Sequence, residues 1–416
     1  MTRNRELADR FGTPLYVYDL DRVVASYQDL RNSLPAGTVV FYSLKANPHP
    51  DVARALREAK GWPPCRAEVS STGELAAAIE AGFAPGECLY TGPGKTESEL
   101  ARAIAEGVRQ FSVESLTDLE RAGGVARRFD AVIDCLLRIN RVSATAAASI
   151  RMMGTPSQFG IDSETLRAQL PLLRSVPGTR LVGAHFYSMS NAVDEQSLIG
   201  ELRQSLVTAA HFHEELSLPM RILDIGGGFG APYAVPGDRP VYDKLRVELE
   251  STLDMYFPDW RSGTPEIVCE SGRYLVGDCG ELVSSVVNVK ESRGRTFVIL
   301  DAGINTLGGM SGLGRLMPLA VKLDAPQVPA DHQTVTLVGP LCTPGDILAR
   351  SVRVPPLAPG DTITVPNVGA YGASASLLLF LSRPAPREVV MRGGEVQTVS
   401  QLEVHRTYGL VRTYDR

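Results

Sequence analysis

The stretch TVVFYSLKANPHPDVARALREAKGWPPCRAEV, residues 38–69, decides the fold. Its first part, Thr38–Leu44, is mostly apolar, β-branched or aromatic, which is typical of a buried strand. Asp51–Lys60 then repeats Ala and Leu at the three- and four-residue spacing of an amphipathic helix. A second apolar run follows at Ala67–Val69. A strand, a helix and a strand in this order favour parallel pairing of the two strands.

The same alternation continues to Glu270, with helix-like stretches such as Gly73–Ala81 and Glu97–Glu106 between strand-like runs. The strand-like runs are Thr38–Leu44, Ala67–Val69, Cys88–Tyr90, Gln110–Val113, Asp134–Ile139, Arg180–Phe186, Arg221–Ile225 and Glu266–Cys269. Eight such units in about 235 residues predict an α/β fold, a closed TIM-like (β/α)8 barrel. An open doubly wound sheet is the alternative.

The pattern changes after Gly277, where short strand-like runs follow one another without long helical stretches. These runs are Val283–Val289, Thr296–Leu300, Thr334–Val338, Thr362–Val365 and Glu388–Met391. They predict a C-terminal β domain, sandwich-like or barrel-like, which the strand-like run Pro14–Tyr18 is expected to join. The expected division is an N-terminal segment over 1–35, a barrel over 36–275 and the β-rich domain over 276–416.

Composition restricts the class of protein. The 416 residues are 44% hydrophobic and 21% charged, which excludes a disordered, collagen-like or coiled-coil chain. A net charge of −5 gives no reason to expect nucleic acid or a membrane surface as a partner. The N-terminus lacks the apolar core of a signal peptide, and six scattered cysteines fit free thiols, so a cytoplasmic protein is expected. The histidine spacing suggests no metal site.

Chemically active residues follow several of the predicted strands, at the barrel end where functional groups gather. Lys45 follows the first strand and precedes a proline-containing turn. A desolvated lysine has a lowered pKa and attacks carbonyl groups, so Lys45 is a Schiff-base candidate. Gly226, Gly227 and Gly228 follow the seventh strand, where backbone N–H groups can bind a phosphate.

Two further residues follow the eighth strand. Arg273 is a charged donor for the same phosphate, and Glu270 is able to hold the ring nitrogen of a heteroaromatic cofactor protonated. A Schiff-base lysine, a phosphate site and an acidic ring partner together indicate pyridoxal phosphate (PLP). These features alone do not choose between decarboxylation and racemisation.

At these residues the sequence resembles the fold type III PLP-dependent decarboxylases, the group that contains diaminopimelate, ornithine and arginine decarboxylases. The resemblance runs nearly end to end, and the order and spacing of its motifs are more specific than any one of them. The motifs are Gly12–Asp19, Tyr42–Asn47, Asp224–Gly230, Glu270–Arg273, Gly339–Cys342 and Gly369–Tyr371.

The resemblance implies a role for each matching residue. Lys45 would form the Schiff base, Glu270 would pair with the pyridinium nitrogen, and Glu68 stands where the family has an aspartate near the Schiff base. Cys342 would return a proton to the carbanion in the neighbouring subunit's site, which implies a homodimer with shared active sites. The residues implied in phosphate binding are Ser190, Gly226, Gly227, Gly228, Gly272, Arg273 and Tyr371.

Besides Glu68, the sequence departs from the family at three places. Tyr187 stands where the family has the histidine that stacks on the cofactor ring, and His185 is the other candidate for stacking. Thr343 stands where diamino-acid enzymes have the carboxylate that binds the distal ammonium of the substrate. The segment from Asp301 to Gly314 is more similar to a branch of secondary metabolism that acts on conjugated amino acids.

The expected function is therefore PLP-dependent decarboxylation of an L-amino acid, conjugated or linked to a carrier protein, in secondary metabolism. Three alternatives stay open: a diaminopimelate decarboxylase of lysine biosynthesis, an amino-acid racemase and a non-catalytic PLP-binding protein. The sequence names neither the exact substrate nor whether it is free or carrier-linked.

Overall fold

The computed structural model describes residues 2–61, 63–141, 150–151, 156–192, 194–308, 322–323 and 332–408. Contacts divide the chain into two compact units. One is a β unit of Met1–Tyr18, Glu281–Pro366 and Gly372–Arg416, and the other is a barrel unit of Asp19–Gly280 with Asn367–Tyr371. The short segment 367–371 therefore belongs to the barrel unit although it lies late in the sequence.

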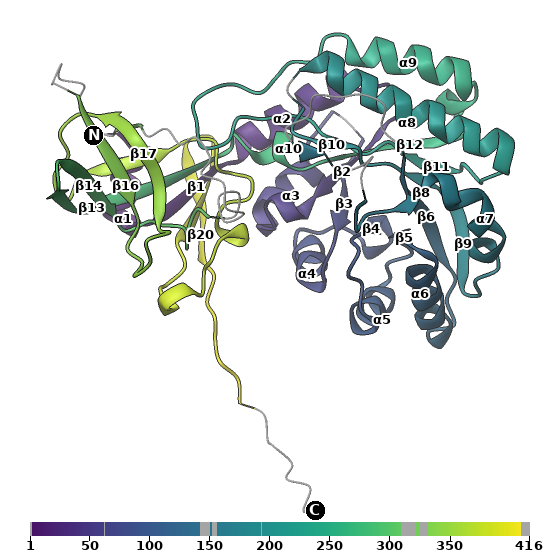
Figure 1. The fold of residues 1–416 in the computed structure, drawn as a ribbon, viewed down its shortest axis with the longest axis horizontal. Helices are drawn as coiled ribbons and strands as arrows, with labels where there is room; N and C mark the ends of the chain where they lie inside the picture. The colour runs from purple at the N-terminus through teal and green to yellow at the C-terminus, as the bar shows by residue number, and fades with distance from the viewer. Residues whose placement is uncertain are drawn as a thin grey trace, which may run out of the picture. The chain divides into compact units, whose positions relative to one another are not determined.

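The barrel unit contains a closed ring of parallel strands (Figure 1). In sequence order the strands are β2 (Val39–Ser43), β3 (Arg66–Val69), β4 (Cys88–Tyr90), β5 (Gln110–Val113), β6 (Ile133–Asn140), β9 (Thr179–His185), β11 (Ile222–Asp224) and β12 (Glu266–Ser271). The ring closes because β12 pairs with β2 and β5 pairs with β6, all in parallel. The predicted (β/α)8 barrel is thus confirmed, and the open sheet is wrong.

Helices follow the strands as the alternating pattern predicts. They are α2 (Leu20–Ser33), α3 (Pro50–Arg57), α4 (Thr72–Glu80), α5 (Glu97–Glu106), α6 (Leu116–Arg128), α7 (Ser163–Arg174), α8 (Glu195–Leu216), α9 (Leu245–Tyr256) and the short α10 (Arg273–Val276). Local sequence sets their ends: Thr96 and Glu99 form a capping box at the start of α5, and Gly107 ends that helix with a φ of 110°.

Apolar side chains fill the inside of the barrel. A buried cluster draws one residue from each of six strands: Phe41, Leu89, Leu136, Val182, Ile222 and Val268. Such a layer makes the barrel a packed core, so the chemistry is confined to the strand ends and the loops after them.

The β unit contains a second sheet, in the order β17-β16-β14-β13-β1-β19-β20, in which β18 also pairs with β13 and with β15. Its strands are β1 (Leu15–Asp19), β13 (Gly280–Ser292), β14 (Arg295–Leu300), β15 (Lys322–Leu323), β16 (Gln333–Val338), β17 (Ile347–Val354), β18 (Thr362–Val365), β19 (Arg387–Arg392) and β20 (Glu395–Gln401). The N-terminal run joins this sheet as β1, as expected, and α1 (Arg3–Phe11) precedes it. The sequence patterns missed the two-residue strand β15 and the longer strands β17 and β20.

The barrel unit also contains strands of two residues. β7 (Ile150–Arg151) pairs with β10 (Met189–Ser190), and β8 (Ile161–Asp162) pairs with the end of β6. Over the described part of the chain, no helix has both the length and the apolar character needed to cross a bilayer.

Candidate active site

Lys45 lies just after β2, in the 3-10 turn η1 (Leu44–Ala46). Its Nζ is 3.3 and 3.2 Å from Oε1 and Oε2 of Glu68, a buried residue of the neighbouring strand β3. The parallel pairing of β2 and β3 brings Lys45 close to Glu68, because Ser43, two residues before Lys45, is the partner of Glu68 across the two strands. Ser70 and Thr91 donate hydroxyl hydrogen bonds to Oε1 of Glu68 and hold the carboxylate in place.

The electrostatics of Lys45 differ from the sequence-based expectation. Burial alone would lower the pKa of Lys45, but the negative charges of Glu68 and Glu270 outweigh burial and raise it. The Lys45 side chain is 38% exposed, so water weakens these attractions without reversing the direction. The expectation of a lowered pKa is therefore wrong for the free amine, because two carboxylates stabilise its charged form.

Glu270 is the last residue but one of β12 and lies close to two other buried titratable residues. Its Oε1 is 3.4 Å from Nε2 of His185 on β9, and Asp224 on β11 completes the group. One ligand-type atom from each residue lies within 4.8 Å of the others, and all three side chains are nearly fully buried. Burial, with the positive charges of Arg138 and Lys45, holds the pKa of His185 well below its usual value, so its ring is neutral.

The glycine triplet after β11 is packed so tightly that side chains are excluded. A Cβ on Gly226 would lie 2.1 Å from the carbonyl oxygen of Phe186, and one on Gly227 would lie 2.0 Å from that of Glu270. Gly226 and Gly228 also have φ values of 76° and 105°, which favour glycine. The loop therefore presents bare backbone at the strand ends, as a phosphate cradle requires.

Other residues implied in phosphate binding lie in the same barrel unit. The buried Arg273 begins α10, with its guanidinium carbon 5.0 Å from the ring centroid of Tyr371. The N–H of Tyr371 donates to the carbonyl of Ala46, directly after Lys45, at 2.7 Å. A Cβ on Gly272 would come within 2.9 Å of Ala46 Cβ. Ser190 is half-buried in β10, beside Met189, whose carbonyl oxygen would lie 3.0 Å from a Cβ on Gly228.

The two candidates for cofactor stacking differ in accessibility. The ring of Tyr187 is half-buried, with its centroid 5.6 Å from Lys45 Nζ and 5.8 Å from the guanidinium carbon of Arg138. The ring of His185 is 1% exposed, and its Nδ1 is hydrogen-bonded to the Ser112 hydroxyl at 2.7 Å. The ring of Tyr187 is therefore accessible and close to Lys45, whereas the ring of His185 is buried in the barrel unit.

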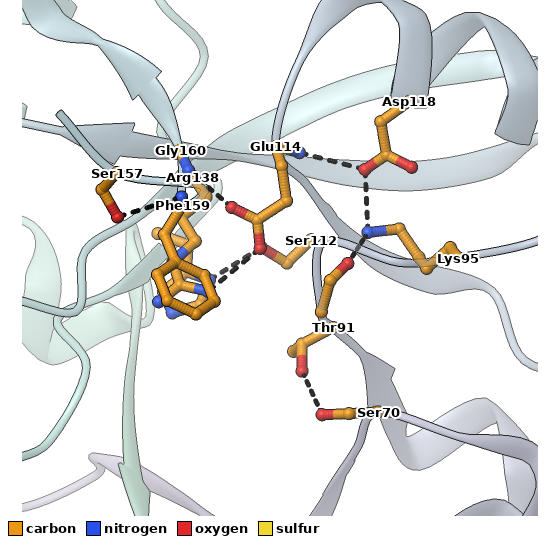
Figure 2. A network of polar contacts seen from close by, with 12 residues as sticks. Ser70, Thr91, Lys95, Ser112, Glu114, Asp118, Arg138, Ser157, Phe159 and Gly160 are labelled. Atoms are coloured by element: carbon orange, nitrogen blue, oxygen red, sulfur yellow. Dashed lines mark hydrogen bonds and ion pairs between the residues drawn. The ribbon is translucent and has the colours of Figure 1, made fainter. Parts of the chain in front are cut away.

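Sequence reasoning gave no role to a network of charges beside this site (Figure 2). Arg138 donates to Glu114 at 3.0 Å, and the other oxygen of Glu114 accepts the N–H of Gly160 at 2.6 Å. Lys95 forms a buried ion pair with Asp118 at 2.8 Å, and Asp118 also accepts the N–H of Glu114. These residues lie in or just after β4, β5 and β6 or at the start of α6, and their positions at strand ends were the available signal.

Cys342 and Thr343 belong to the β unit and lie in the loop between β16 and β17. Cys342 is the one exposed thiol among the six free cysteines, and Thr343 is half-buried. Asp346 shapes the loop, because its buried carboxylate accepts the N–H groups of Ile304 at 2.8 Å and Leu341 at 2.7 Å. Residues 309–314 of the segment singled out in the sequence lie outside the described residues.

The barrel site fits pyridoxal phosphate on three observations. The side chain of Lys45 follows β2 and is 38% exposed, a Cβ on Gly226 or Gly227 would clash with backbone, and Glu270 Oε1 is buried without a hydrogen-bond partner. Lys45 would hold the aldehyde carbon, the glycines and Arg273 the phosphate, and Glu270 the ring nitrogen.

Comparison with known proteins supports the same conclusion. Residues 20–277 match the family "Pyridoxal-dependent decarboxylase, pyridoxal binding domain". The L-glutamyl-[BtrI acyl-carrier protein] decarboxylase of Niallia circulans is 33% identical over 398 residues, covering 94% of this chain and 92% of that protein. The 2-[(L-alanin-3-ylcarbamoyl)methyl]-2-hydroxybutanedioate decarboxylase of Staphylococcus aureus is 30% identical over 384 residues, with coverages of 90% and 93%.

A solved structure shows the same likeness in three dimensions. Diaminopimelate decarboxylase from Helicobacter pylori, complexed with L-lysine, aligns with a TM-score of 0.81 at 25% identity, covering 94% of this chain and 95% of that one. The glycine cradle, the strand-end lysine and these matches lead to one assignment: the chain belongs to the pyridoxal-dependent decarboxylases and is a carboxy-lyase with pyridoxal 5′-phosphate as its cofactor.

Proposed function

We propose that this enzyme decarboxylates an L-amino acid whose distal end is conjugated to an acyl group or to a carrier protein. Secondary metabolism, a cytoplasmic location and a homodimer with shared active sites are part of the same proposal. The names of the Niallia circulans and Staphylococcus aureus relatives support it, since each describes a decarboxylase of a conjugated amino acid.

The observation that carries the proposal is the absence of a free carboxylate in the described loop 339–346. Thr343 follows Cys342, and its Oγ1 accepts the N–H of Gly345 at 3.3 Å. The one acid of this loop, Asp346, is buried and uses both oxygens on backbone N–H groups. A substrate ammonium entering beside Thr343 would lose water without gaining a counterion, which is costly.

Each site residue has a proposed task in the reaction. When bound, pyridoxal phosphate accepts the electron pair left on the α-carbon as carbon dioxide departs. Lys45 holds the cofactor, and Glu68 orients the Lys45 amine by accepting its hydrogen bonds. Glu270 keeps a proton on the ring nitrogen, and Cys342 of a second copy returns a proton to the α-carbon.

The phosphate and the ring are also assigned to residues. Ser190, Gly226–Gly228, Gly272, Arg273 and Tyr371 hold the phosphate, and Tyr187 stacks on the ring. Tyr187 is preferred to His185 because its ring is accessible and close to Lys45, whereas the ring of His185 is buried and bonded to Ser112.

The second candidate is a diaminopimelate decarboxylase, which the Helicobacter pylori structure favours. The two candidate functions predict different preferred substrates. Purified enzyme with pyridoxal phosphate is incubated with meso-diaminopimelate, ornithine, glutamate, an acylated 2,3-diaminopropionate and carrier-linked glutamate, while carbon dioxide and product mass are measured. A conjugated or acidic substrate should exceed free diamino acids by about a hundredfold in kcat/KM, equivalent to about 2.8 kcal/mol. Efficient turnover of diaminopimelate with inert conjugates would favour the second candidate.

A substitution tests the role of Thr343 directly. Thr343→Glu supplies the missing counterion and should raise kcat/KM for diaminopimelate by about tenfold, because one ion pair of about 1.4 kcal/mol is gained. Thr343→Gln is the matched control, since it has the same size without the charge and should give no gain. Equal gains in both variants would show that size, not charge, governs selection.

A further inference from the structure

Three buried polar atoms near the ends of β9, β11 and β12 have no hydrogen-bond partner: His185 Nε2, Asp224 Oδ2 and Glu270 Oε1. One ligand-type atom from each of the three residues lies within 4.8 Å of the others, and the residues are 1%, 0% and 2% exposed. Two ionised carboxylates so close and so dry would repel each other strongly. The arrangement therefore requires hydrogens that satisfy these acceptors.

His185 can supply one of them. Its Nδ1 lies 2.7 Å from the Ser112 hydroxyl, which has a hydrogen to donate. If Ser112 donates to Nδ1, the neutral ring carries its own hydrogen on Nε2, directed at Glu270 Oε1 3.4 Å away. That hydrogen is donated to Glu270, so Asp224 Oδ2 still has no hydrogen-bond donor.

The cations near His185, Asp224 and Glu270 do not neutralise the two carboxylates of this group, because each cation already forms an ion pair with a different carboxylate. Lys45 is paired with Glu68, Arg138 with Glu114 and Lys95 with Asp118. Glu68 itself adds a further negative charge, and Cys269, the neighbour of Glu270 on β12, is a buried thiol whose pKa is raised well above its usual value. Burial also raises the pKa of Asp224 to about 7 and that of Glu270 well above its usual range.

We propose that Asp224 and Glu270 share one proton, and that Asp224 is the positioning residue that holds Glu270 toward the cofactor ring. The functional part of this inference rests on the proposed role of Glu270, whereas the shared proton is a property of the protein alone. With Asp224 carrying the proton at Oδ2, Glu270 is free to bear the negative charge that faces the ring nitrogen.

Asp224 also connects this group to the phosphate cradle. Its Oδ1 accepts the N–H of Gly226 at 2.8 Å, and the carbonyl of Gly226 accepts the N–H of Glu270, also at 2.8 Å. The Asp224 side chain thus accepts a hydrogen bond from the glycine loop with Oδ1, and its Oδ2 is left for the interaction with Glu270. Both ends of the cofactor site should respond when Asp224 changes.

Infrared spectroscopy of the full-length protein without cofactor tests the shared proton. The carbonyl stretch of a protonated carboxylic acid is well separated from carboxylate bands, and wild type should show a band from this pair at about pH 6, below the pKa of about 7 of Asp224. Asp224→Asn and Glu270→Gln should each abolish this band, because the amide then donates to the remaining carboxylate. Glu201→Gln is the control, since Glu201 is a buried carboxylate paired with Arg141 and should leave the band intact.

Two outcomes would overturn the shared proton: the band surviving in both variants, or disappearing in only one of them. Because no substrate or cofactor is present, neither outcome depends on whether the proposed function is correct. A failure of the proposed function would appear only in the turnover assays and would leave the infrared result unchanged.

Cofactor binding by the same variants tests the positioning role. Asp224→Ala leaves the Gly226 N–H without its acceptor and Glu270 without its neighbour, so the Kd for pyridoxal phosphate should rise at least about tenfold. Asp224→Asn keeps both contacts and should raise it by less than about threefold. The absorption of the bound cofactor should change with pH in Asp224→Ala but not in Asp224→Asn. Similar behaviour of the two variants would refute the positioning role.

Discussion

At the scale of single residues, the decisive group is Lys45, whose amine lies between a buried carboxylate and solvent. Glu68 and Glu270 raise the pKa of Lys45, so the free lysine is protonated at neutral pH. Its attack on a carbonyl therefore requires that a proton first leave, and the Glu68 carboxylate, 3.2 Å away, is the nearest acceptor.

Replacement of Lys45 by Ala should remove the covalent link to the cofactor. The expected result is loss of the visible absorption band, of borohydride-trapped adduct and of turnover. Mass spectrometry of tryptic peptides after borohydride treatment locates the adduct in wild type. A trapped adduct on another lysine would rule out the assignment of Lys45.

The raised pKa of Asp224 makes a prediction about pH and stability. Its native pKa of about 7 exceeds the unfolded value of about 4, so the native state binds more protons between these values. The stabilisation is therefore complete below about pH 4 and is lost as the pH rises through about 7, at no more than about 1.4 kcal/mol per pH unit. Urea unfolding of the protein without cofactor should show this decline in wild type and a flatter profile in Asp224→Asn. Parallel profiles would contradict it.

At the scale of the elements, the eight barrel strands were predictable because each is a short apolar run between an amphipathic helix and a turn. The strands β17 and β20 were not, since polar residues interrupt them: Arg350, Ser351 and Arg353 fall within β17. In the sequence, Asp224 stands out only because it precedes Ile225 and the glycine triplet. Nothing local indicates that a parallel register would place it beside His185, as it does.

The packing of the glycine loop gives a prediction for that element. Gly227→Ala would place a Cβ 2.0 Å from the Glu270 carbonyl oxygen, so the loop must move, and cofactor affinity should fall at least about tenfold. Gly200→Ala is the control: it lies on an exposed helical face with nothing within 4 Å and should stabilise the protein by about 0.5–1 kcal/mol. Equilibrium binding and thermal unfolding measure both. Unaltered affinity in Gly227→Ala would mean that the loop does not hold the phosphate.

The loop that carries Cys342 gives a second prediction at this scale. Asp346→Ala leaves two backbone N–H groups without their acceptor, so the loop should loosen and expose its thiol further. The rate of Cys342 labelling by a disulfide reagent should rise, and turnover should fall about tenfold or more with cofactor binding unchanged. Asp361→Ala, which removes a single bond in an exposed turn, should alter neither. An unchanged labelling rate in Asp346→Ala would refute the structuring role.

At the scale of the whole molecule, the proposed homodimer requires each site to combine Lys45 of one copy with Cys342 of the other. Lys45→Ala and Cys342→Ala should each be inactive alone. Mixed after dissociation, they should regain about a quarter of wild-type activity, because half of the dimers are mixed and each of these has one intact site. Sedimentation before and after mixing confirms exchange of subunits. Exchange without recovered activity would exclude shared sites.

The five residues 367–371 restrict how the β unit of this chain can be exchanged for that of a relative. The Asn367 amide donates to the carbonyls of Val235 and Gly237, and the N–H of Tyr371 to that of Ala46, so this segment completes the barrel from outside its continuous stretch. A chimaera that takes its β unit from a relative with a single crossover near Gly280 would import a foreign piece of barrel. Compatible exchange needs four crossovers, after 18, 280, 366 and 371, because the two units alternate along the chain.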